Sequence, residues 1–182
     1  MSGVISVVGR RPSDCNGAEI ADFMSLVLAG GEVTAKDLEK RVRAAVSLVF
    51  LNVGCCLCGV AALKSPEESY RKRIASSSGA SLPREQFLYE LGWVFVMPSS
   101  RGRHYSFDQA REAIASAGGA GVFSTSRTDN RQMHATLSKL QFAPIGRAYH
   151  SNRGDYQLQL FVRHAAQQPV TGDAHEPKRH TT

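Results

Sequence analysis

Arg101, Gly102 and Arg103 directly follow an apolar, strand-like segment at residues 87–97. A helix is predicted to begin soon after them, because apolar residues recur at helical spacing from Phe107 onwards. The first backbone N–H groups of a helix lack intrahelical partners and carry partial positive charge. Two arginines and a glycine at such a corner predict an anion site that suits a pyrophosphate. The alternative is a solvated basic turn that caps the helix.

The rest of the chain supplies the elements that position this corner. β-Branched runs, helical stripes and turn signals divide it into strands and helices. In chain order we expect a strand at 3–9, helices at 17–29 and 34–46 with Thr34 as N-cap, two strands within 47–63 around a turn at 52–54, a strand at 87–97, a helix at 107–117, a strand at 121–126, a helix at 129–140, and two strands at 142–151 and 155–163.

This order indicates how the strands pair. A strand–helix–strand unit after residue 87 implies one parallel pair, whereas the flanking hairpins are antiparallel. We therefore predict an α/β fold with a mixed, mostly antiparallel central sheet flanked by helices. The polar, basic segment at 65–86 is interpreted as a surface insertion with a short helix at 67–74. Residues 1–164 are expected to form a single domain, and 165–182 a disordered tail.

Of the broad classes of protein, the composition argues only against a membrane protein. The chain has 182 residues, of which 42% are hydrophobic, and its formal net charge of +6 favours an anionic partner without selecting phosphorylated cofactor or nucleic acid. No apolar run reaches the roughly 20 residues of a membrane span, and no signal peptide is apparent.

The cysteines favour a reduced, cytoplasmic setting. Three of the four, Cys55, Cys56 and Cys58, fall in one apolar run, where we expect buried strand residues. Without a second Cys/His cluster at zinc spacing we predict no metal site.

The loop at the centre of the chain resembles a known signature. Val96-Met-Pro98 precedes Arg101-Gly-Arg-His104-Tyr-Ser106. This resembles the GNAT superfamily of N-acetyltransferases, whose strand often ends in Val-x-Pro before (Arg/Gln)-x-x-Gly-x-(Gly/Ala). Asn130 and Phe142 match the family's next helix, and the last hairpin is also similar. The resemblance covers residues 47–163 and implies a GNAT-type sheet.

In that family the fold binds acetyl-CoA, the loop wraps the pyrophosphate, and a backbone N–H of the strand end polarises the thioester carbonyl. The resemblance implies that acetyl-CoA is the co-substrate here. The residues that it places at the cofactor are Phe95, Val96, Met97, Arg101, Gly102, Arg103, His104, Tyr105, Ser106 and Asn130.

This sequence departs from the family pattern at four positions. Ser106 stands where the family has Gly or Ala, and serine is nearly as small. His104 stands where the family has glycine, and we expect its ring to point outward while its backbone N–H faces the phosphate. Leu137 occupies the position where a tyrosine often acts as general acid, and Gln141 replaces the glycine before Phe142.

Two side chains are candidates for proton transfer. Some family members carry a glutamate base eleven residues before the first signature position, where Glu90 stands here. A carboxylate is costly to bury in an apolar strand, so a chemical role is one explanation of Glu90. Tyr149, at a strand end near the expected cleft, is the second candidate and could protonate the leaving thiolate.

The resemblance thus implies an acyl-CoA-dependent N-acyltransferase that transfers an acyl group directly to an unidentified amine. Two alternatives stay open. One is a GNAT-fold protein that modifies or binds nucleic acid, and the other is a degenerate domain that binds CoA or a protein without catalysis. A homodimer is also left open.

Overall fold

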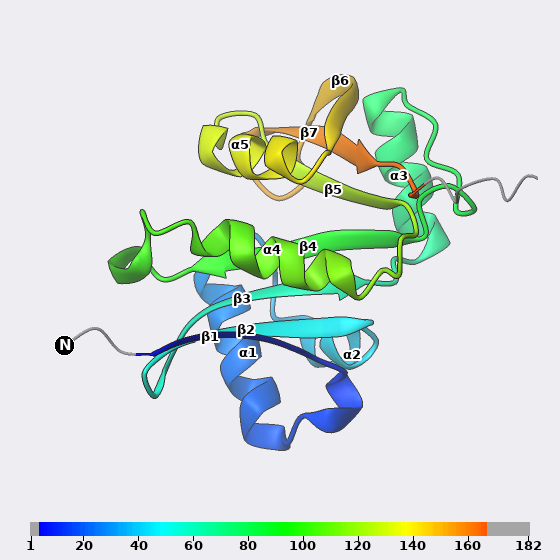
Figure 1. The fold of residues 1–182 in the computed structure, drawn as a ribbon. Helices are drawn as coiled ribbons and strands as arrows, with labels where there is room; N and C mark the ends of the chain where they lie inside the picture. Colours follow the sequence, from blue (N-terminus) through cyan, green and yellow to red (C-terminus); the bar gives the residue numbers. More distant parts are fainter. Residues whose placement is uncertain (1–3, 167–182) are drawn as a thin grey trace, which may run out of the picture.

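The computed structural model describes residues 4–166, which form one mixed sheet flanked by helices (Figure 1). Within these residues the sheet has seven strands in the order β1-β2-β3-β4-β5-β7-β6. Every neighbouring pair is antiparallel except β4 with β5, which confirms the predicted parallel unit. The strands are β1 (Ile5–Arg10), β2 (Ser47–Val53), β3 (Cys56–Lys64), β4 (Tyr89–Val96), β5 (Val122–Arg127), β6 (Ala143–His150) and β7 (Gln157–Arg163).

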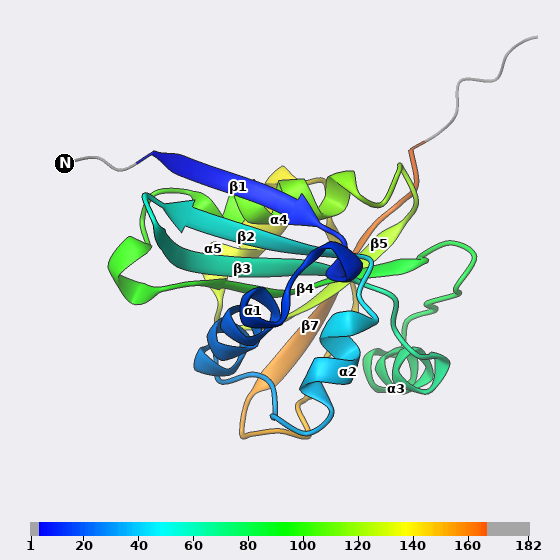
Figure 2. The same cartoon turned by 90° about the horizontal axis from the view of Figure 1, so that it is seen from below.

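Helices cover both faces of the sheet (Figure 2). One face packs against α4 (Tyr105–Ala115) and α5 (Arg131–Lys139). The other packs against α1 (Gly17–Ala29), α2 (Leu38–Arg43) and α3 (Glu68–Ser78). Short 3-10 turns, η1 (Pro12–Asp14) and η2 (Pro98–Ser100), precede α1 and α4.

The start of α1 shows how local sequence fixes an element. The Asn16 side chain accepts a hydrogen bond from the Glu19 N–H at 2.9 Å, and the Glu19 carboxylate accepts one from the Asn16 N–H at 2.9 Å. This reciprocal capping box satisfies two N–H groups. The apolar stripe of Ile20, Phe23 and Val27 is then buried against the sheet.

The second predicted helix is shorter than expected. It begins at Leu38 instead of after Thr34, and its N-cap is Asp37 in a left-handed conformation with φ 54°. The Arg41 guanidinium donates hydrogen bonds to the backbone carbonyls of Thr34 and Lys36, at 3.0 and 3.1 Å. These bonds hold residues 34–37 as a loop, so the prediction that Thr34 caps the helix is wrong.

The segment at 65–86 is more than the predicted surface insertion. Its helix α3 extends to Ser78, beyond the short helix expected at 67–74. Arg71 and Ile74 of α3 are buried, and the Arg71 guanidinium donates to the carbonyls of Phe87 and Leu88, both at 2.6 Å. This contact fixes α3 beside the first residues of β4.

The cysteine prediction holds for only one residue of the cluster. Cys58 is buried in β3, whereas Cys55 and Cys56 are exposed at the turn between β2 and β3. The error arises because the apolar run extends through the hairpin turn, where side chains face solvent.

Two further sequence expectations concern the C-terminal tail and membrane-spanning segments. The tail predicted for 165–182 lies outside the described residues from residue 167 onwards. Among residues 4–166, no helix combines the length and the apolar character that crossing a membrane requires.

Candidate active site

The parallel pair β4–β5 is open along most of its length. Only Tyr89 with Val122 and Glu90 with Phe123 are paired. After Glu90, β4 keeps its ladder with β3, while β5 keeps its ladder with β7 (Figure 1). The two facing edges therefore carry backbone N–H and C=O groups without a partner strand, and such edges readily accept an extended ligand.

A cavity of about 1270 Å³ runs along this opening. It is lined by most of the residues that the sequence predicted for the site. Those that line it are Phe95, Val96, Arg101, Gly102, His104, Tyr105, Ser106, Asn130, Glu90 and Tyr149, whereas Met97 and Arg103 do not.

A bulge in β4 turns its backbone towards the cavity. The register between β3 and β4 shifts between Val60 and Ala62, and Trp93 adopts a left-handed conformation with φ 54°. A bulge locally disrupts the ladder and redirects the strand. No residue pattern predicts this bulge, because tryptophan rarely adopts positive φ.

Only some of the backbone N–H groups after the bulge are free to bind a ligand. The N–H of Met97 donates to the Cys58 carbonyl at 2.8 Å, so it is committed to β3. Because N–H groups alternate along a strand, that of Val96 points to the opposite edge, towards the opening. Of the three strand-end residues predicted to polarise a carbonyl, Val96 is therefore the one suited to it.

The loop after β4 leads into α4, which begins at Tyr105 instead of at the predicted residue 107. His104 is the N-cap, and no side chain caps the helix there. The first N–H groups of α4 are thus left for a ligand. Tyr105, by contrast, is buried with Leu51, Cys58 and Val96, which anchors the helix start.

Backbone conformation explains why glycine is usual at the His104 position. His104 has φ 61° and Gly102 has φ 82°, both in the left-handed region that favours glycine. The His104 side chain is exposed. An imidazole is thus tolerated sterically, at some cost in backbone strain.

Two other predicted binding groups already have intramolecular partners. Arg101 Nε donates to the Val96 carbonyl at 3.1 Å, so the guanidinium folds back towards the end of β4 and its terminal nitrogens remain for a ligand. The Asn130 side chain accepts from the Met133 N–H at 3.0 Å and caps α5. Leu137 is fully buried in the core, so it offers no polar group to the cavity.

Glu90 lies at the deep end of the opening and is 4% exposed. Its Oε2 is 2.9 Å from Lys64 Nζ, and its Oε1 accepts a hydrogen bond from the Tyr70 hydroxyl at 3.0 Å. Burial, then the negative charge of Glu90, raises the pKa of Tyr70 well above its usual range. Burial and Glu90 likewise raise the pKa of Tyr149 to about 12. Both phenols therefore stay protonated at neutral pH and can donate hydrogen bonds.

Sequence reasoning missed Lys64 and Tyr70. Lys64 is directly opposite Glu90 in the β3–β4 register, and Tyr70 comes from α3. Strand register and the placement of α3 depend on long-range packing, so no local signal identified either residue.

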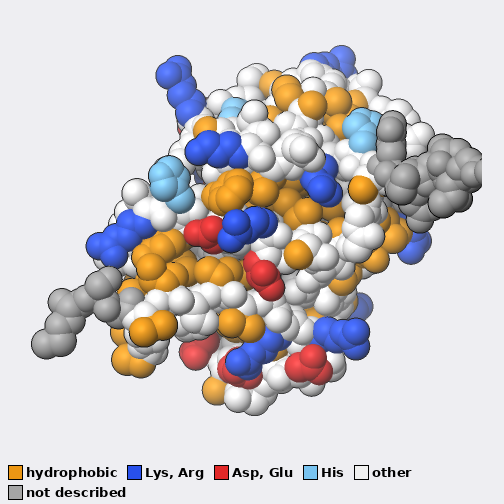
Figure 3. All heavy atoms as spheres, in the orientation of Figure 1, with side chains coloured by type: hydrophobic (Ala, Val, Ile, Leu, Met, Phe, Trp, Pro, Cys, Tyr) orange, Lys and Arg blue, Asp and Glu red, His pale blue; other side chains and the backbone are white. Residues whose placement is uncertain are grey.

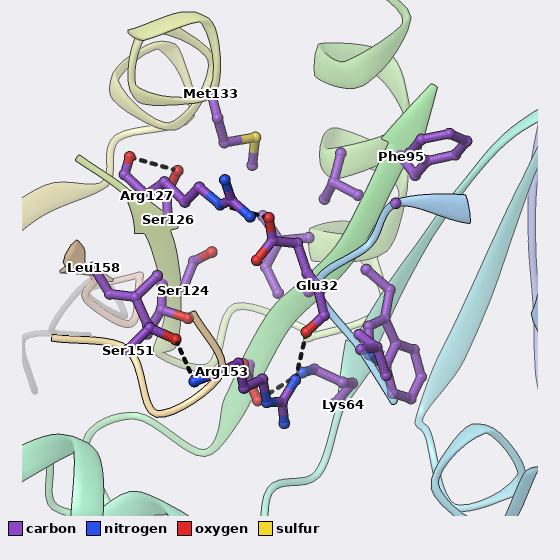
Figure 4. A pocket seen from close by; sticks show the side chains of 18 of the residues that line it. Glu32, Lys64, Phe95, Ser124, Ser126, Arg127, Met133, Ser151, Arg153 and Leu158 are labelled. Atoms are coloured by element: carbon purple, nitrogen blue, oxygen red, sulfur yellow. Dashed lines mark hydrogen bonds and ion pairs between the residues drawn. The ribbon is translucent and has the colours of Figure 1, made fainter. Parts of the chain in front are cut away.

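Glu32 joins the two sides of the cavity mouth (Figure 4). Its Oε1 is 2.6 Å from Arg127 Nε, although the N–H is not aligned for a hydrogen bond, and its Oε2 accepts from the Tyr156 hydroxyl at 2.9 Å. The Glu32 carbonyl accepts from Arg153 at 2.6 Å. These contacts, here named the Glu32 strap, tie the α1–α2 loop to β5 and the β6–β7 turn.

Charge on the surface is mixed. Figure 3 shows Lys and Arg side chains interspersed with hydrophobic and acidic side chains on one face of the molecule. That face carries no continuous basic strip of the kind that nucleic-acid binding favours.

Comparisons with known proteins identify the fold. No protein-family model and no curated protein sequence matches the chain. Among solved structures, Escherichia coli ElaA is 11% identical, with a TM-score of 0.63 over 86% of this chain and 99% of that one. Arabidopsis thaliana NAA60 in complex with acetyl-CoA is 11% identical, with a TM-score of 0.63 over 87% of this chain and 99% of that one.

A third structure, an acetyltransferase of the GNAT family from Streptococcus pneumoniae, is 14% identical, with a TM-score of 0.61 over 88% of this chain and 99% of that one. The chain therefore has the GNAT acyl-CoA N-acyltransferase fold. The predicted mixed sheet is confirmed, and the resemblance seen in the sequence holds at the level of the fold.

Proposed function

We propose that this protein is an acyl-CoA-dependent N-acyltransferase that transfers an acetyl group directly from acetyl-CoA to an amine. One observation carries the proposal: a single cavity joins the anion site at the start of α4 to the Glu90 carboxylate through the β4–β5 opening. The cytoplasm is the proposed compartment, where the free cysteines would stay reduced.

The residues present fit acetyl-CoA. The uncapped N–H groups of α4, with the terminal nitrogens of Arg101, suit a pyrophosphate. The unpaired edges of β4 and β5 can hydrogen-bond an extended arm that contains amides. When bound, acetyl-CoA supplies a thioester whose carbonyl carbon an amine can attack.

Each remaining role falls to a group that faces the cavity. Glu90 accepts the proton of the attacking amine, directly or through water. The Val96 N–H is placed to donate to the developing oxyanion. The Tyr70 hydroxyl binds one oxygen of Glu90, and the second oxygen, which is paired with Lys64 Nζ at 2.9 Å, is the one proposed to accept the proton.

Tyr149 is better suited to hydrogen bonding than to acid catalysis. Its pKa of about 12 lies well above the roughly 8.5 of an ordinary thiol, so passing its proton to a leaving thiolate is unfavourable. We propose that Tyr149 donates a hydrogen bond near Glu90 and that the thiolate takes its proton from the attacking amine.

Two measurements test the proposal together. Acetyl-CoA at about 100 times its Kd should raise stability by about 2.7 kcal/mol, seen as a higher melting temperature. A panel of amines, assayed by thiol release, should then contain at least one acceptor. Stabilisation without turnover on any amine would favour a CoA-binding domain without catalysis. No stabilisation at millimolar acetyl-CoA would refute the proposal.

A further inference from the structure

The Lys64 amine lies beside the Glu90 carboxylate, where the proposed mechanism requires an acceptor amine. Lys64 is the last residue of β3 and faces Glu90 across the ladder, with Nζ 2.9 Å from Oε2. Its side chain is 18% exposed, against 5% for that of Glu90, and it lines the cavity. Both residues line the cavity, and the Lys64 side chain is the more accessible of the two.

The path of the Lys64 side chain depends on Gly92. A Cβ built on Gly92 would lie 2.6 Å from Lys64 Cε and 2.7 Å from Nζ, so the lysine crosses β4 directly over this glycine. Its Nζ then lies 5.0 Å from the centroid of the Trp93 ring, where β4 bulges. Nζ therefore lies between the proposed base and the bulge, and Lys64 lines the cavity in which the proposed function places the thioester.

We infer that Lys64 is itself an acyl acceptor, so that the protein acylates its own Lys64 Nζ from bound acyl-CoA with Glu90 as base. This inference rests on the proposed function, since it needs the same thioester in the same cavity. It adds a covalent modification site to the chain.

The step balances without any further reactant. Lys64 loses one proton to the Glu90 carboxylate, and the neutral amine attacks the thioester carbonyl carbon. The N–C bond forms, the C–S bond breaks, and the second nitrogen proton goes to the departing sulfur. The products are acyl-Lys64 and CoA thiol, and Glu90 returns its proton to solvent.

Acylation would also change the site. The Lys64 ammonium becomes a neutral amide, so Glu90 loses its ion-pair partner and keeps the Tyr70 hydrogen bond. The carboxylate then has no cation beside it when it takes a proton from a second amine.

Two other lysines line the same cavity and serve as internal controls. Lys36 and Lys40 are exposed and come from the α1–α2 loop and from α2. No carboxylate of the described residues lies within 4 Å of either one. Chemical acetylation by acetyl-CoA in solution should label them at least as fast as Lys64, because their side chains are more accessible.

The experiment incubates the purified full chain with isotope-labelled acetyl-CoA and follows each lysine by peptide mass spectrometry. The label distinguishes new groups from any acquired during expression. Lys64 should be labelled faster than Lys36 and Lys40, at a rate per chain that does not change with protein concentration. The same protein in urea gives the background rate.

Two variants separate chemistry from folding. Glu90→Gln should slow labelling of Lys64 by about 100-fold or more, the usual contribution of a general base, without changing labelling of Lys36. Lys64→Arg keeps a cation opposite Glu90 and should take no label at that position, while its melting temperature stays close to that of the wild type.

The outcomes also distinguish this inference from the proposed function. If acetyl-CoA raises the melting temperature but Lys64 is labelled no faster than Lys36 or than in urea, Lys64 is only an ion-pair partner and the inference fails alone. If acetyl-CoA gives no stabilisation, the proposed function and this inference fail together.

Discussion

Glu90 and Phe123 form the last residue pair between β4 and β5, and beyond them the two strands separate. Paired residues of neighbouring strands share a face of the sheet, so both side chains face α3. Phe123 is fully buried in a core cluster with Ile74 of α3, while Glu90 accepts the hydrogen bond of Tyr70 from the same helix. Packing against α3 thus closes the point where β4 and β5 diverge, and it holds the Glu90 carboxylate at the deepest point of the opening.

This position makes Glu90→Gln the most direct test of catalysis. The amide keeps the shape of the side chain but accepts no proton, so kcat at pH 7 should fall by about 10²–10⁴-fold. Acetyl-CoA binding should persist, and activity should recover partly at high pH, where more of an amine with pKa near 10 is unprotonated. Glu67→Gln, which changes an exposed carboxylate of the same cavity, is the matched control. Wild-type turnover of Glu90→Gln from about pH 6 to 9 would rule out this role.

The two arginines of the loop should differ in their effect. Arg101 lines the cavity, whereas Arg103 is exposed outside it. Arg101→Ala should weaken acetyl-CoA binding by about 1–3 kcal/mol, the range for charged hydrogen bonds, while Arg103→Ala should cost less. Isothermal titration calorimetry of both variants checks this. Equal losses would mean that the loop contributes general positive charge instead of one specific contact.

His104 supports a prediction about stability. A left-handed conformation costs an ordinary residue about 1–2 kcal/mol, and glycine avoids this strain but loses about 0.5–1 kcal/mol more in chain entropy. His104→Gly should therefore raise the free energy of unfolding by up to about 1.5 kcal/mol and leave acetyl-CoA binding intact. Urea unfolding measures the first and calorimetry the second. Gly102→Ala, at φ 82°, should change stability in the opposite direction. Loss of affinity in His104→Gly would show that the imidazole touches the ligand.

Local signals predicted the elements that form the opening. An apolar run ending at Pro98 gave β4, and the stripe from Phe107 gave α4, so the corner between them could be placed from sequence. The start of α2 was misplaced because Arg41, a residue inside the helix, binds carbonyls of the preceding loop. That bond depends on the fold of the loop, which no pattern of residue types specifies.

The site was predictable only in part, for the same physical reason. Glu90 and the signature at 101–106 could be identified because each has a fixed spacing along the chain. The pairing of Glu90 with Lys64 requires the β3–β4 register, and the strap through Glu32 requires a loop to meet a distant strand end. Both contacts come from tertiary packing, which sequence spacing does not encode.

The Glu32 strap should affect the acceptor more than the cofactor. Glu32→Ala removes the contacts with Arg127 and Tyr156, and the mouth of the cavity should open. We expect a raised KM for the amine and an unchanged Kd for acetyl-CoA, with stability lowered by less than about 1 kcal/mol because the ion pair is exposed. Glu39→Ala, which breaks an exposed ion pair with Arg43 away from the cavity, is the control. An unchanged KM would limit the strap to a structural role.

Tyr149 provides a test through pH. Burial, then the charge of Glu90, raises its pKa to about 12 in the folded chain, whereas an unfolded tyrosine ionises near pH 10. As pH rises, the unfolded chain therefore loses this proton first. The stability that the neutral phenol contributes is fully present below about pH 10 and is lost between about pH 10 and 12. Tyr149→Phe has no proton to lose, so its urea midpoint should fall less steeply across that range.

Burial and the charge of Glu90 also raise the pKa of Tyr70. Tyr70→Phe should therefore also make the urea midpoint fall less steeply with pH, and the double variant should reduce the slope further. Urea midpoints measured at several pH values, with an ultraviolet titration of tyrosine ionisation in each variant, check both. The comparison must be made between variants, because lysines titrate in the same range. A slope for Tyr149→Phe equal to that of the wild type would mean that this phenol ionises near its ordinary pKa. It would then be a more competent proton donor to the leaving thiolate than we propose.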